Sequence, residues 1–178
     1  MYSIVLSLTL FRILAAPFVF IAAIFLENYW LAFWLFNLAA LTDYFDGYLA
    51  RKYSQESDFG KVFDPIADKI LICFSLISIS LYLSNPFIGL LTSIVLAREI
   101  IVSGLREFAS HSDSKGLLDV TFFAKTKTSI QFVTIISYLV GFYLNNSFLI
   151  FVSHWILFLA TLVTIKSGYD YYLKLFSQ

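Results

Sequence analysis

The chain has 178 residues and a formal net charge of zero, with 60% hydrophobic and only 13% charged residues. Soluble domains carry about 25% charged residues, and a domain this small cannot hide so much apolar surface, so a soluble globular protein is excluded. The bilayer must therefore solvate most of the chain, and the zero net charge gives no indication of nucleic acid as a partner.

Apolar stretches of the length needed to cross a bilayer, about 20 residues, follow one another along the chain. They cover residues 4–26, 30–49, 62–84, 86–109, 125–145 and 148–172. Short polar or turn-forming segments separate them. The sequence therefore predicts an all-α integral membrane protein, in which a single domain over residues 1–178 forms a bundle of six transmembrane helices.

The basic residues lie on one side of this bundle. In an antiparallel arrangement, the breaks at 27–29, 84–86 and 145–147 share a side and contain no Lys or Arg. All 12 basic residues fall on the opposite side or in the helix halves nearest it. The positive-inside rule then predicts a cell (inner) membrane protein with both termini in the cytoplasm. Arg12 and Lys166 lie within apolar stretches, where they either snorkel to the interface or face a polar cavity.

Aspartates gather where the second span ends and the third begins. Asp43 and Asp46 are spaced i, i+3, and Asp64 and Asp68 are spaced i, i+4, so each pair shares a helix face. The short connection brings the two pairs together, and two Mg²⁺ or Mn²⁺ ions would neutralise the four carboxylates. Two such ions form a clamp suited to phosphoryl displacement. Asp64 before Pro65 also fits a helix N-cap with proline at the first helical position.

Small and basic residues accompany the aspartates. Gly47 and Ala50 leave room against the second span, and Gly60 permits a close approach where the chain re-enters the membrane. Arg51 is placed to bind a phosphate through two hydrogen bonds, although it could instead pair with the first two aspartates.

The segment from Asp43 to Asp68 reads D-x2-D-G-x2-A-R-x8-G-x3-D-x3-D. This pattern resembles the signature of the CDP-alcohol phosphatidyltransferases at every position. The resemblance implies a homodimer of six-helix subunits with the active site at the cytoplasmic face. It also implies that the four aspartates hold two divalent cations and that Asp68 acts as the base. The CDP-lipid site would be lined by Gly47, Ala50, Arg51 and Gly60.

A second polar patch lies on the fourth and fifth spans. Glu99, Ser103 and Arg106 share one helix face, which Arg98 flanks, and basic residues also begin the fifth span. We predict that these spans bind the phosphate of an acceptor through Arg98, Arg106, Lys125 and Lys127. An internal ion-pair network on the fourth span, and lysines that only set the topology, are the alternatives. Near the C-terminus, an interfacial belt is expected from Tyr169, Tyr171 and Tyr172.

These stretches are similar to those of bacterial family members that act on glycerol 3-phosphate. The resemblance implies transfer of a phosphatidyl group from CDP-diacylglycerol to sn-glycerol 3-phosphate, with release of CMP. Serine, inositol phosphate and phosphatidylglycerol are the alternative acceptors. A divalent-cation transporter is the alternative from another class, but alternating access needs polar breaks on both sides, and here the polar residues crowd one side.

Overall fold

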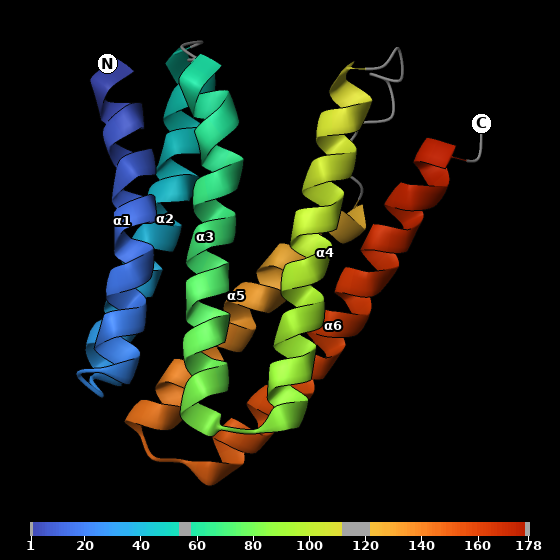
Figure 1. Ribbon diagram of the computed structural model, residues 1–178. Coiled ribbons are helices and arrows are strands. Elements are labelled where there is room, and N and C mark those ends of the chain that lie inside the picture. The colour runs from blue at the N-terminus through green and yellow to red at the C-terminus, as the bar shows by residue number, and fades with distance from the viewer. Residues whose placement is uncertain (1, 54–57, 112–121, 177–178) are drawn as a thin grey trace.

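The computed structural model describes the backbone of residues 2–53, 58–111 and 122–176, and the side chains of residues 9–42, 63, 66–107 and 126–173 (Figure 1). Within these ranges the chain forms six helices, which differ from the expected spans by a few residues at each end. They are α1 (Tyr2–Ile24), α2 (Tyr29–Tyr53), α3 (Asp58–Leu83), α4 (Pro86–His111), α5 (Phe122–Tyr143) and α6 (Ser147–Phe176). The prediction of an all-α chain is confirmed.

In the described part, three helical stretches are long and apolar enough to cross a membrane: Ile66–Leu83, Pro86–Glu107 and Ser147–Leu173. Two shorter apolar helical stretches run over Thr9–Ile24 and Tyr29–Thr42. Large side chains such as Phe18 and Leu14 are exposed on the outside of α1, whereas Ala15 is buried. Large apolar residues outside and small residues at helix contacts are typical of a bundle solvated by lipid. The chain is a multi-pass membrane protein.

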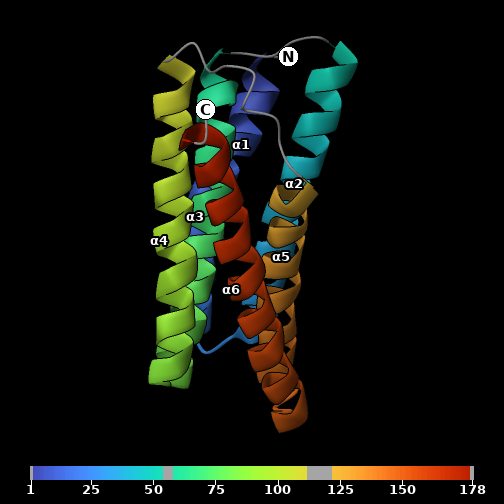
Figure 2. The ribbon, with the colours of Figure 1, turned by 90° about the vertical axis from the view of Figure 1, so that its right-hand side faces the viewer.

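The helices alternate in direction, so both termini lie at the same end of the bundle (Figure 1). The connections α1–α2, α3–α4 and α5–α6 lie at the opposite end. Helix α1 packs against α2 and α3, and α6 lies between α4 and α5 (Figure 2). Helix α5 also contacts α2 and α3, which joins the two halves of the bundle. The antiparallel arrangement predicted from the breaks is therefore present.

The three connections at the far end share one local structure. Each contains a residue with positive φ followed directly by an asparagine, in the pairs Glu27-Asn28, Ser84-Asn85 and Asn145-Asn146. The asparagine side-chain oxygen caps the next helix by accepting a backbone N–H bond, from Leu31 at 3.0 Å, Phe87 at 2.9 Å and Leu149 at 3.1 Å. The left-handed residue ends one helix and the asparagine begins the next, so each connection needs few residues.

Candidate active site

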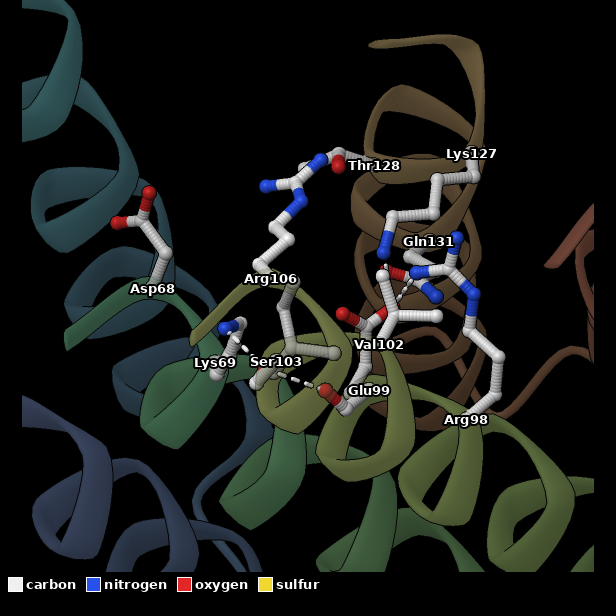
Figure 3. Close-up of a pocket in the computed structure, with 11 residues that line it drawn as sticks. Asp68, Lys69, Arg98, Glu99, Val102, Ser103, Arg106, Lys127, Thr128 and Gln131 are labelled. Atoms are coloured by element: carbon white, nitrogen blue, oxygen red, sulfur yellow. Dashed lines mark hydrogen bonds and ion pairs between the residues drawn. The ribbon is translucent and has the colours of Figure 1, made fainter. Parts of the chain in front are cut away.

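A polar cavity of about 170 Å³ lies between α3, α4 and α5 (Figure 3). It lies in the half of the bundle that carries both termini, since its residues fall late in α4 and early in α3 and α5. Most of its lining residues are charged or polar. They are Asp68, Lys69, Ile72, Arg98, Glu99, Val102, Ser103, Arg106, Lys127, Thr128 and Gln131. Such a concentration of polar groups within a membrane bundle marks a functional site.

Asp68 forms the α3 wall of the cavity and is held from behind by α1. Arg12 Nη1 donates to Asp68 Oδ1 at 2.5 Å, and the Arg12 side chain is fully buried. The Asp68 side chain keeps 31% of its surface exposed. Of the two interpretations of Arg12, the structure shows the inward one: its guanidinium reaches a carboxylate at the cavity. This hydrogen bond from a buried arginine fixes the position of the Asp68 carboxylate at the cavity edge.

Glu99 connects three helices on the opposite wall. Its Oε1 accepts hydrogen bonds from Lys127 Nζ of α5 and, at 3.4 Å, from Arg98 Nη1 of the same helix. Arg98 Nη2 also donates to Ser167 Oγ of α6 at 2.7 Å. The three charged residues are each less than 10% exposed. The ion-pair network considered as an alternative is thus present, and its members line the cavity as well.

A glycine on α6 makes room for this network. A Cβ at Gly168 would lie 3.2 Å from Arg98 Cγ and 3.3 Å from its Nε. Few real Cβ contacts are this close, so the arginine side chain would have to shift by a few tenths of an ångström. The Ser167-Gly168 pair therefore combines a hydrogen-bond acceptor with the space that the arginine side chain needs.

The middle of the cavity is formed by Arg106 and by Lys69, which sequence reasoning assigned no role. Lys69 Nζ donates to Ser103 Oγ, and Ser103 Oγ donates to the Glu99 carbonyl at 2.5 Å. The Arg106 guanidinium carbon lies 5.7 Å from the centre of the Tyr171 ring. Among the described residues, its buried Nε has no hydrogen-bond partner. Four cations and two anions line the cavity, an excess of two positive charges.

Two expectations from the sequence are wrong. Tyr171 is buried beneath Arg106 rather than part of an interfacial belt, although Tyr169 is exposed as expected. Helix α3 begins at Asp58, so Pro65 lies inside the helix and not at its first position. Tyr171 is buried because its ring packs against the Arg106 guanidinium. Pro65 lies inside α3 because the polar segment before the third span continues as helix.

Several predicted site residues can be placed by helix only. Asp43, Asp46, Gly47, Ala50 and Arg51 belong to α2, Gly60 and Asp64 to α3, and Lys125 to α5, but their side chains lie outside the described ones. The i, i+3 and i, i+4 spacings of the aspartates are helical as expected, and α2 contacts α3. Asp68, Arg98, Arg106 and Lys127 are the predicted site residues that the structure brings to one cavity.

Sequence reasoning also missed Gln131, which lines the cavity from α5. It follows Lys127 by four residues and therefore shares its helix face. That spacing was visible in the sequence. An isolated glutamine in an apolar span carried no further signal, because such residues also join helices without a ligand.

Comparison with known proteins places the chain in a family. The profile of the CDP-alcohol phosphatidyltransferases matches residues 5–166, and the chain belongs to that family. The membership inferred from the aspartate motif is confirmed.

Individual relatives carry names that are more specific than the family name. The chain is 47% identical over 138 residues to a protein of Cereibacter sphaeroides, covering 75% of this chain and 62% of the relative. It is 44% identical over 135 residues to one of Wigglesworthia glossinidia brevipalpis, covering 74% of each. It is 35% identical over 137 residues to one of Escherichia coli K12, covering 75% of each. All three are named CDP-diacylglycerol–glycerol-3-phosphate 3-phosphatidyltransferase.

Proposed function

We propose that this chain transfers the phosphatidyl group of CDP-diacylglycerol to sn-glycerol 3-phosphate, giving phosphatidylglycerol phosphate and CMP. The observation that carries the proposal is the cavity that contains Asp68 and whose lining as a whole has an excess of two positive charges. A phosphate monoester carries about −1.5 to −2 charges at neutral pH and matches this excess. Serine, whose net charge is near zero, would leave buried cations uncompensated, which is unfavourable in a membrane protein. The names of the relatives support the same acceptor.

The donor end of the reaction is assigned to α2 and the start of α3. Carboxylate oxygens at helical spacing on two contacting helices fit hard divalent cations, and Asp68 reaches the cavity edge. Two Mg²⁺ or Mn²⁺ ions held by Asp43, Asp46, Asp64 and Asp68 would neutralise the diphosphate and the charge that develops on CMP. Gly47, Ala50, Arg51 and Gly60 are proposed to line the CDP-lipid site.

The acceptor chemistry falls to Asp68 and the basic wall. Asp68 takes the proton from the C1 hydroxyl of glycerol 3-phosphate, whose oxygen attacks the lipid-bearing phosphorus. A new P–O bond forms, the P–O bond to CMP breaks, and CMP leaves with the bonding electrons. Arg12 keeps the Asp68 carboxylate in place during this step. Arg106 and Lys69 lie between Asp68 and the Glu99 network and are proposed to hold the acceptor phosphate (Figure 3).

Three further features belong to this proposal. The end with both termini is proposed to face the cytoplasm, because the three connections at the opposite end contain no Lys or Arg. Residues 1–178 are proposed to act as one domain. A homodimer is proposed from the family resemblance. The molar mass of the purified protein in detergent tests whether it is a dimer.

The reaction is tested with purified protein, CDP-diacylglycerol and one acceptor at a time. CMP release should be fastest with glycerol 3-phosphate and slower with serine, inositol phosphate or phosphatidylglycerol. Faster release with one of these would leave the family chemistry intact and replace the acceptor. An absence of CMP with all four acceptors, in the presence of Mg²⁺ or Mn²⁺, would contradict the proposal and revive the transporter alternative.

A further inference from the structure

Gln131 lines the cavity with a side chain that is almost fully buried. Its side chain is 1% exposed, and its Nε2 donates to Thr164 Oγ1 of α6 at 3.3 Å. Its Oε1 is buried and has no hydrogen-bond partner within the described part of the chain. A buried amide oxygen without a partner is unfavourable, and native proteins rarely leave one so. A ligand that donates a hydrogen bond at this point would resolve the deficit.

The neighbours of Gln131 show which ligand group fits. Lys127, one turn earlier on α5, is bonded to Glu99, and Arg98 is bonded to both Glu99 and Ser167. Figure 3 shows Gln131 beside these residues, across the cavity from Asp68. The four cations of the lining, Lys69, Arg98, Arg106 and Lys127, attract a phosphate through charge. A phosphate dianion is an acceptor only and cannot pair with an amide oxygen, whereas a hydroxyl can.

We propose that Gln131 determines acceptor specificity by accepting a hydrogen bond from the secondary, non-reacting hydroxyl of the acceptor. This inference rests on the proposed function, in which the primary hydroxyl lies at Asp68 and the phosphate at the basic wall. The secondary hydroxyl is carried by the carbon between these two groups. Gln131 donates to the Glu99 carboxylate as well as to Thr164, and this fixes the amide with Oε1 free to accept from the hydroxyl.

The test compares two acceptors that differ by this hydroxyl alone. Glycerol 3-phosphate and propane-1,3-diol monophosphate share the primary hydroxyl and the phosphate. The wild-type enzyme should prefer glycerol 3-phosphate by about tenfold or more in kcat/KM, measured by CMP release. Gln131→Met keeps the side-chain length without a hydrogen-bonding group, and should bring this ratio close to one by slowing the reaction of glycerol 3-phosphate alone. Gln131→Asn, which withdraws the amide, should also reduce the ratio.

Thr164→Val is the matched control. It removes the same hydrogen bond between α5 and α6 but leaves the Gln131 amide, so the ratio of the two acceptors should stay at the wild-type value. An equal loss with both acceptors in Gln131→Met would overturn the inference and assign Gln131 to helix packing or to a bound water. Equal rates with both acceptors in the wild-type enzyme would overturn it too. If wild-type enzyme released no CMP with glycerol 3-phosphate, the proposed function itself would fall, and this inference with it.

Discussion

Replacing Arg106 with alanine tests the assignment of the acceptor site most directly. The guanidinium lines the cavity and contacts the face of the Tyr171 ring at 5.7 Å. A hydrogen bond to a charged group contributes about 1.5–3 kcal/mol. Since about 1.4 kcal/mol corresponds to a factor of ten, Arg106→Ala should raise the KM for glycerol 3-phosphate by roughly 10-fold to 100-fold. The KM for CDP-diacylglycerol should change little, because Arg106 is not part of the proposed donor site.

Tyr171 provides a graded control for this experiment. Its ring supports the guanidinium by a cation–π contact of about 0.5–1 kcal/mol, so Tyr171→Leu should raise the same KM by roughly 2-fold to 5-fold. Tyr171→Phe keeps the ring and removes a buried hydroxyl that has no partner among the described residues, so the KM should not change. CMP release in mixed micelles, with each substrate varied in turn, measures both constants. If Arg106→Ala weakened CDP-diacylglycerol and spared glycerol 3-phosphate, the two substrates would have been placed the wrong way round.

Three other predictions concern the metals, the packing and the topology. EDTA should abolish CMP release, and Mg²⁺ or Mn²⁺ should restore it. Asp68→Asn should lose activity by several orders of magnitude and still fold. Full activity without divalent ions would contradict the metal assignment. Gly168→Ala should lower the thermal stability in detergent because its Cβ meets an arginine side chain at 3.2 Å, whereas Gly104→Ala, with nothing within 4 Å, should not. In an otherwise cysteine-free protein, Glu27→Cys should react with an impermeant thiol reagent outside intact cells and Gln55→Cys should not; the reverse result would invert the topology.

The helices and the family could be predicted from the sequence because both depend on local spacing. Apolar stretches of spanning length and an aspartate pattern confined to residues 43–68 need no knowledge of tertiary contacts. The bonding partners of the individual basic residues could not be predicted in this way. Arg98 and Arg106 lie on one span, but the first is bonded to Glu99 and Ser167 while the second rests on Tyr171.

These partners come from helices that are distant in the sequence, and composition gives no means of choosing between them. The same reason hid the contact between Arg12 and Asp68, whose positions differ by 56 residues. Gln131 is a residue whose helix face could be predicted from the sequence but whose hydrogen bonding could not. Its spacing from Lys127 was visible, but only the packed structure shows that its amide oxygen has been left without a partner among the described residues.

The three asparagine-capped connections divide the bundle into three hairpins, whose turns all lie at the same end. At that end each pair of helices is tied by a turn whose backbone bonds are made, such as Asn28 N to Ala22 O at 2.9 Å and Asn146 N to Gly141 O at 3.0 Å. These bonds hold the two helices of each pair together at the turn. The cavity lies toward the opposite end of the bundle, where the proposed lipid and phosphate substrates would enter. We therefore expect backbone amides near these turns to exchange with deuterium more slowly than those at the cavity end.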